Sequence, residues 1–97
     1  MFKVIHESRE TDSQREASRE YMEMILELPE TSGDGDFATE LQFRHEDGSI
    51  SKRVVLHPTK SQAMAYASTV DMNAGSFLCR IDVTFRGEVF GTWVYQR

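Results

Sequence analysis

Apolar and polar residues alternate in some stretches of the chain and recur every three to four residues in others. Alternation with a period of two predicts β-strands, whereas apolar residues at i, i+4 and i+7 predict helices. Strand patterns lie at 2–6, in two arms of the segment 37–56, at 77–86 and at 89–97, and helical spacing covers 11–28 and 59–74. The predicted order of elements is therefore β-α-β-β-α-β-β.

The segment 11–28 predicts an amphipathic helix. Either Thr11 with Gln14 or Ser13 with Glu16 has the spacing of a capping box. Pro29 ends the helix, because the residue before a proline disfavours α geometry. The stripe expected to face the core follows the 3.6-residue repeat and consists of Ala17, Tyr21, Met24, Ile25 and Leu28.

The segment 37–56 predicts a β-hairpin. Asp47 and Gly48 suit a two-residue type I′ turn, in which both central residues have positive φ. Such a turn would place Leu41 opposite Val54. One face would then be apolar, with Phe37, Leu41, Phe43, Ile50, Val54 and Leu56, and the other polar, with Glu40, Gln42, Arg44, Ser51 and Arg53.

Two further segments complete the pattern. The polar stretch 30–36, with its two glycines, predicts a loop, and 59–74 predicts the second helix. Thr59 is the expected N-cap, followed by Gln62 three residues later, and Gly75 is the expected stop. The apolar stripe of this helix is rich in alanine and consists of Ala63, Tyr66, Ala67 and Val70.

These elements predict one α+β domain over residues 1–97. Right-handed crossovers would place both helices on one face of a mainly antiparallel sheet. The first six elements have the order of the split βαβ, or ferredoxin-like, arrangement, and the last strand would extend the edge formed by the strand at 77–86. A chain of this length can form one core without disulfides, and this one has a single cysteine.

The last strand, VFGTWVYQR, carries large apolar side chains on both faces. A two-residue turn before it would place Trp93 and Tyr95 on the face without helices, beside Arg80. A three-residue loop with a bulge would turn both rings inward and expose Phe90 and Val94 instead. Either arrangement leaves an apolar patch rimmed with charge, which is typical of an interaction site, unless a loop or the chain terminus covers it.

Charge is unevenly distributed along the chain, whose formal net charge is −5. Residues 1–50 contain thirteen acidic and five basic residues, whereas residues 51–97 contain three acidic and six basic ones. An acidic chain binds phosphates poorly, so direct binding to nucleic acid is not expected. The acidic side chains favour a basic protein partner, or serve solubility alone. They are Glu16, Glu20, Glu23, Glu27, Glu30, Asp34 and Asp36.

No pattern predicts a cofactor, a metal site or a catalytic centre. His6, His45 and His57 lack metal-ligand spacing to one another or to Cys79. The glycines in 30–36 lack the Lys-Ser/Thr pair of a phosphate loop and the distal glutamate of a calcium loop, and no convincing acid–base pair is present. Without a signal peptide or an apolar run of about 20 residues, the chain is expected in the cytoplasm.

The combined features predict a non-enzymatic protein-binding accessory module. Phe90, Trp93, Tyr95 and Arg80 would anchor the partner, and the acidic residues would meet a basic nucleic-acid-handling complex. In size and charge the chain is similar to phage- and plasmid-encoded accessory proteins, anti-CRISPR and other anti-defence inhibitors among them, which implies an inhibitor. The alternative is a ferredoxin-like homodimer, with sheets packed face to face, that senses or processes a small ligand.

Overall fold

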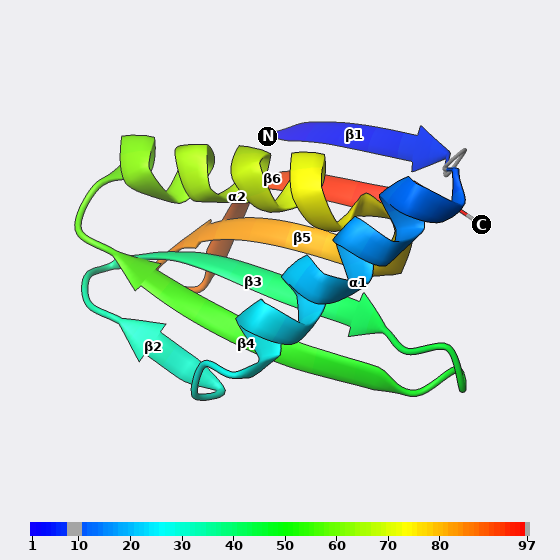
Figure 1. Ribbon diagram of the computed structural model, residues 1–97. Helices are drawn as coiled ribbons and strands as arrows, with labels where there is room; N and C mark the ends of the chain where they lie inside the picture. Colours follow the sequence, from blue (N-terminus) through cyan, green and yellow to red (C-terminus); the bar gives the residue numbers. More distant parts are fainter. Residues whose placement is uncertain (8–10, 97) are drawn as a thin grey trace.

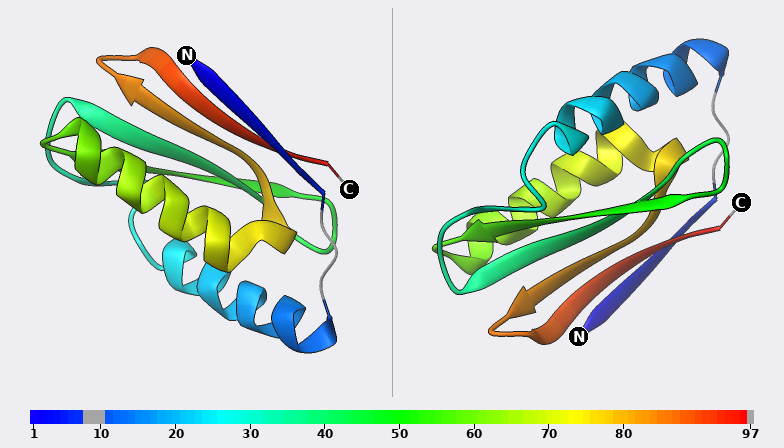
Figure 2. Two further views of the ribbon diagram at one scale, coloured as in Figure 1. Left: turned by 90° about the horizontal axis from the view of Figure 1, so that it is seen from above. Right: turned by 90° about the horizontal axis from the view of Figure 1, so that it is seen from below.

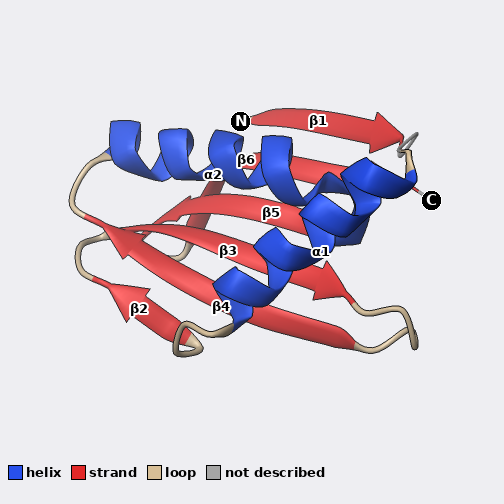
Figure 3. Ribbon diagram, in the orientation of Figure 1, coloured by secondary structure: helices blue, strands red, loops and turns tan. Residues whose placement is uncertain are grey.

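A six-stranded mixed sheet carries both helices on one of its faces (Figure 1, Figure 3). The computed structural model describes residues 1–7 and 11–96. Its elements are β1 (Phe2–Glu7), α1 (Asp12–Leu26), β2 (Thr31–Gly33), β3 (Phe37–Arg44), β4 (Ile50–His57), α2 (Lys60–Ala74), the 3₁₀ turn η1 (Gly75–Phe77), β5 (Leu78–Phe85) and β6 (Glu88–Gln96). The predicted α+β class, with both helices on one face, is confirmed.

The strand order is β1-β6-β5-β3-β4-β2, with parallel pairing of β1 to β6 and of β2 to β4. This order differs from a ferredoxin-like sheet with the last strand at its edge. β6 does pair with β5, but β1 lies outside it. Trp93 of β6 points toward the helices, and β1 shields its ring at this edge of the sheet. Phe2 of β1 packs edge-on against the indole, with 4.9 Å between the ring centroids.

Both helices begin at the predicted caps. Thr11 and Gln14 form the capping box of α1, in which the Gln14 N–H donates to Thr11 Oγ1 at 3.2 Å and the Thr11 N–H donates to Gln14 Oε1 at 2.9 Å. The Thr59 side chain accepts from the Gln62 N–H at the start of α2. α2 lies directly on the sheet (Figure 2). It buries Ala63, Ala67 and Val70 as predicted, and Ala74 in addition, whereas Tyr66 of the predicted stripe is half-buried.

Helix α1 is rotated about its axis from the predicted orientation, so that Ile25 of the predicted stripe is buried but most of the stripe is not. Ala17 is exposed, and Met24 keeps 52% of its surface accessible. The helix packs against α2, η1 and β4 (Figure 2), so these neighbours determine its inward face rather than the most apolar stripe. Its buried residues are Ser18, Met22 and Ile25.

The loop of the β3–β4 hairpin has three residues, 46–48, instead of the predicted two. The backbone N–H of His45 donates to the carbonyl of Ser49 at 2.8 Å and closes the loop. Gly48 has a φ of 90°, as expected for the left-handed residue of a three-residue hairpin loop. The predicted register is therefore wrong by one residue.

This shift exchanges the two faces of β4, because a one-residue slip turns every side chain of a strand over. Leu41 pairs with Arg53 rather than Val54. Arg53 faces the helices and donates to the carbonyls of Leu26 at 2.8 Å and Leu28 at 3.0 Å, which satisfies the end of α1. The face without helices instead receives Ile50, Val54 and Leu56.

The last strand combines parts of both alternatives considered from the sequence. Its turn has two residues with positive φ, Arg86 at 50° and Gly87 at 84°, as in the first alternative. A bulge then inserts Phe90 as an extra residue in the pairing with β5. Beyond the bulge the side chains have the inward orientation of the second alternative.

Trp93 is only 6% exposed and belongs to the hydrophobic core. Tyr95 and Phe90 are half-buried and pack against the same core, and the Tyr95 hydroxyl donates to the Asp71 carboxylate of α2 at 2.5 Å. Val94 lies on the face without helices but is also half-buried. The prediction of an exposed aromatic patch on the last strand is therefore wrong, because the bulge turns the indole into the core.

The short strand β2 lies in the segment predicted to be a loop. It pairs in parallel with β4, where Gly33 is in register with Leu56. Just beyond it, Gly35 has a φ of 130°, and a Cβ atom there would lie 1.9 Å from the His57 carbonyl oxygen. Glycine permits this close approach of two backbones.

Candidate functional site

The residues predicted to bind a partner lie in separate parts of the domain. Four of them form one row on α1, which we call the carboxylate stripe and define as Glu16, Glu20, Glu23 and Glu27. Asp34 is exposed between β2 and β3, and Asp36 pairs with Arg86 at 3.2 Å. Arg80 lies on the face without helices, and the three aromatic residues of β6 point inward. No single surface brings the predicted set together.

The carboxylate stripe is the most exposed of these groups. Its members recur at i, i+4, i+7 and i+11, which places them on one face of the helix, and all four are exposed. This face is opposite the buried one, which contains Met22 and Ile25. Within the described ranges, the cation that pairs with a stripe residue is Arg19, which contacts Glu16 at 2.8 Å.

The face of the sheet without helices is polar at its centre. Glu40 of β3 is in register with Asp82 of β5, and Asp82 accepts hydrogen bonds from Arg80 at 2.8 Å and from Thr92 at 2.7 Å. Packing two such faces together would bury these charges, which is costly unless each of them is paired. The face-to-face homodimer considered from the sequence is therefore not our proposal.

A cavity of about 170 Å³ lies where the β3–β4 loop meets α1 and η1. The carboxylate of Glu46 pairs with Arg15 at 3.5 Å and with Arg19, and the hydrogen bond from Arg19 lowers the pKa of Glu46. Both guanidinium groups also stack on Phe77, at 5.0 and 5.9 Å from the ring centroid. This arrangement holds the hairpin loop against the helix.

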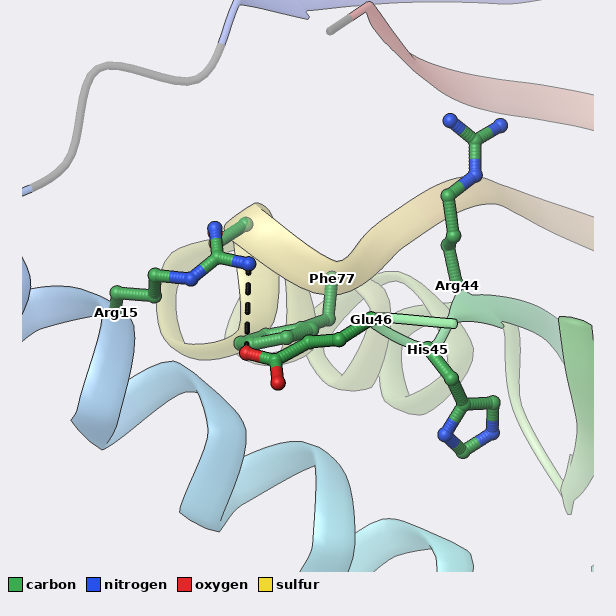
Figure 4. A pocket seen from close by; sticks show the side chains of 6 residues that line it. Arg15, Arg44, His45, Glu46 and Phe77 are labelled. Atoms are coloured by element: carbon green, nitrogen blue, oxygen red, sulfur yellow. Dashed lines mark hydrogen bonds and ion pairs between the residues drawn. The ribbon is translucent and has the colours of Figure 1, made fainter. Parts of the chain in front are cut away.

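The remaining basic side chains of this cavity do not complete an anion site. Figure 4 shows Arg44 and His45 pointing away from the pair formed by Arg15 and Glu46. His45 instead lies 2.6 Å from the Ser51 hydroxyl through its Nε2 atom. The positive charges that converge here already have their carboxylate, so we interpret the contact as structural.

A larger cavity of about 510 Å³ opens at the end of the sheet where α2 begins. We call it the aromatic cavity. Phe37 and Phe85 pack with centroids 4.7 Å apart, and Phe90 lies edge-on to Phe37 at 6.1 Å. The ammonium group of Lys60 lies 5.1 Å from the centroid of the Phe90 ring. The lining consists mainly of Phe37, Phe85, Val89, Phe90, Lys60 and Glu88.

Sequence reasoning found Phe90 but missed the rest of this cavity. Phe37 and Phe85 are in register on the face of the sheet that carries the helices, but neither ring is fully buried there. Phe85 consequently keeps 37% of its surface exposed. The usable signal is their position at the strand ends next to turns, where a layer of helices often stops short.

A buried polar group lies between β3, β4 and α2. Thr39 Oγ1 donates to the Ala63 carbonyl at 3.1 Å and lies 3.2 Å from His57 Nε2. Burial lowers the pKa of His57, so the imidazole is neutral at pH 7. The ring of Tyr66 packs on His57 at 5.3 Å, and its buried hydroxyl has no hydrogen-bond partner among the residues that the structure describes.

Replacing Tyr66 with phenylalanine is expected to raise the free energy of unfolding by about 1 kcal/mol, because it removes a buried hydroxyl without a partner. The measurement is urea denaturation near pH 7. Thr39→Val is the matched control, since it removes a hydroxyl that does have partners and should lower stability. Destabilisation by Tyr66→Phe would mean that the hydroxyl is satisfied after all.

The same substitution should change the alkaline limb of the stability profile. Burial raises the pKa of Tyr66 to about 12, from 10.0. Between these values the folded chain keeps a proton that the unfolded chain releases, so stability falls as the pH rises. Denaturation series from pH 9 upward should show a shallower fall for Tyr66→Phe than for the wild type.

Other features of the described residues add no site. No group of three or more histidine, cysteine, aspartate or glutamate side chains that could hold a metal ion occurs within 1–7 and 11–96. Cys79 is a free thiol of intermediate burial. No helix in this part of the chain combines the length and apolar character needed to cross a membrane.

The carboxylate stripe and the aromatic cavity thus have the features of binding surfaces. No family model, curated protein or solved structure matched the chain when they were compared with it. What these two surfaces bind therefore has to follow from their charge and shape.

Proposed function

We propose that this chain is a non-enzymatic protein-binding module whose carboxylate stripe docks on a basic surface of its partner. The proposal is carried by one observation: four exposed glutamates occupy the helix face opposite the buried one. At 1.5 Å per residue the stripe is about 16 Å long. A row of this length can engage several basic side chains at once, which gives orientation as well as attraction.

Apart from the Glu16–Arg19 pair, the charges of the stripe do not stabilise the helix that carries it. Like charges at i, i+3 and i+4 each cost about 0.2–0.5 kcal/mol on a helix surface. Glu23 and Glu27 also lie toward the C-terminal end of α1, where the helix dipole disfavours negative charge. This local cost supports a role of the stripe in binding rather than in folding.

The partner that fits this surface is a protein with a basic region, of the kind that binds nucleic acid. Such regions attract negative charge over distances of about 10 Å at moderate salt. An inhibitor that covers a nucleic-acid channel would present carboxylates where the phosphates otherwise lie. We favour this form of the proposal.

The test is a triple variant, Glu20→Gln, Glu23→Gln and Glu27→Gln. Affinity for the partner, captured by cross-linking in lysate of the source cells and then purified, is expected to fall at least about tenfold near 0.1 M salt. The affinity of the wild type should fall in the same direction near 1 M salt, where the Debye length is about 3 Å. The free variant should be as stable as the wild type or slightly more so.

The matched control removes the same charge elsewhere, through Glu30→Gln, Asp34→Asn and Glu40→Gln, at exposed positions outside α1. This control should bind within about twofold of the wild type. Equal losses in the two triple variants would show that net charge matters and the stripe does not, which would contradict the proposal.

A further inference from the structure

The aromatic cavity has an apolar body and a charged mouth. Its volume of about 510 Å³ lies within the range of about 300–1,000 Å³ that is usual for ligand sites. From this geometry we propose that it binds a small carboxylate with an aromatic or aliphatic body. This proposal is independent of the carboxylate stripe, because no residue of α1 lines the cavity.

The walls explain the apolar part of the ligand. Phe37, Phe85 and Phe90 meet in tilted and edge-on arrangements, so a further ring can stack on the faces and edges that they leave open. Phe85 is 37% exposed although its ring points toward the helix layer. A ligand body in the cavity would remove this apolar surface from water, which is the main driving force of such binding.

Charge at the mouth explains the carboxylate. Lys60 is the first residue of α2, and within the described residues its ammonium group contacts the Phe90 ring and has no carboxylate partner. The free N–H groups of the first helical turn add positive potential in the same place. A carboxylate bound here would gain both interactions.

Glu88 determines the orientation of the ligand. It also lines the cavity, and its negative charge would repel a carboxylate placed beside it. The apolar body therefore lies toward the rings and the head group toward Lys60. The same residue opposes binding overall, so removing its charge should tighten it.

The test uses three probes that share one ring and differ in their head group: 4-phenylbutyrate, 4-phenylbutanol and 4-phenylbutylamine. Titrations followed by backbone amide NMR should show saturable shifts at Phe85 and Phe90. Phenylbutyrate is expected to bind about fivefold more tightly than the alcohol, and the amine should bind most weakly.

Variants at the mouth then assign this preference. Lys60→Gln should reduce the preference for phenylbutyrate over phenylbutanol, whereas Glu88→Gln should tighten the binding of phenylbutyrate. Lys52→Gln, at an exposed position of β4, is the control for net charge and should leave the ratio unchanged. Both test positions are exposed, so the variants should fold, which circular dichroism confirms.

Three results would overturn the proposal. They are the absence of saturable shifts with all three probes, equal affinities of the wild type for acid and alcohol, and a Lys52→Gln effect as large as that of Lys60→Gln. A fourth result, tighter binding of acetyl-Leu-Phe with a free carboxylate than of phenylbutyrate, would contradict a small-molecule ligand and indicate that the cavity binds the C-terminus of a peptide.

Discussion

Replacement of Trp93 by alanine is expected to lower the free energy of unfolding by about 3–5 kcal/mol, the usual loss for a buried aromatic residue. The indole is 6% exposed, packs edge-on against Phe2 and is in register with Ile81 of β5 and Val4 of β1. Such a loss is a large part of the about 5–15 kcal/mol that stabilises a typical domain.

The measurement is urea denaturation followed by far-ultraviolet circular dichroism, because the variant lacks the fluorescent indole. Ile5→Ala is the control on the neighbouring strand β1, since Ile5 is 54% exposed and its loss should cost less than about 1 kcal/mol. Equal small losses in the two variants would mean that the indole is outside the core. The exposed aromatic patch expected from the sequence would then return as an explanation.

Replacement of Gly35 by alanine should cost about 2–5 kcal/mol, because a strained backbone and a steric overlap both contribute. Its φ of 130° is unfavourable for any residue with a Cβ atom, and that atom would lie 1.9 Å from the His57 carbonyl oxygen and 2.6 Å from Pro58 N. The backbone has to move apart at this point. We expect β2 to separate from β4, with faster amide hydrogen exchange at Val54, whose N–H donates to the Glu30 carbonyl at 2.7 Å.

Gly48→Ala separates the two contributions. Gly48 also has a positive φ, of 90°, but nothing lies within 4 Å of the position that a Cβ atom would take there, so only the conformational cost of about 1 kcal/mol applies. The difference between the two variants then measures the close approach of the backbones. Similar losses at both positions would show that the contact at Gly35 is relieved at no cost.

Much of the fold could be predicted from local chemistry. Thr11 and Thr59 mark the starts of the helices because their side chains satisfy free N–H groups, and the alanine stripe of α2 is buried as its spacing indicates. The alternating segments all form strands. These features depend on residues close together in the sequence, which is why the sequence alone reveals them.

The wrong predictions concern strands in which one additional residue, in a turn or a bulge, exchanges the side chains on the two faces of the strand. A three-residue loop with Gly48 in the left-handed region uses the same Asp-Gly pair as the predicted two-residue turn, so the sequence does not distinguish them. The extra residue Phe90 in β6 likewise leaves the alternation intact on either side of it, but the residues after it point to the opposite face from the one that uninterrupted alternation would give. The inward position of Trp93 follows from that inversion.

The candidate sites show the same division. Helical spacing alone places the four glutamates of the carboxylate stripe on one face, and all four are exposed. The aromatic cavity is formed by residues of β3, β5, β6 and the start of α2, which are remote from one another in the sequence and meet only through packing. No pattern of neighbouring residues in the sequence predicts this arrangement.

The pairing of β1 with β6 has a consequence for how the domain is made. Phe2 is in register with Gly91, so β1 leaves the ribosome well before β6, the strand that hydrogen-bonds to it in the sheet. Bringing β1 and β6 together is slow, because the conformational entropy of the long intervening segment is lost before the contacts between the two strands stabilise the fold. Until then β1 is an unprotected edge that a chaperone, or another nascent copy, can occupy.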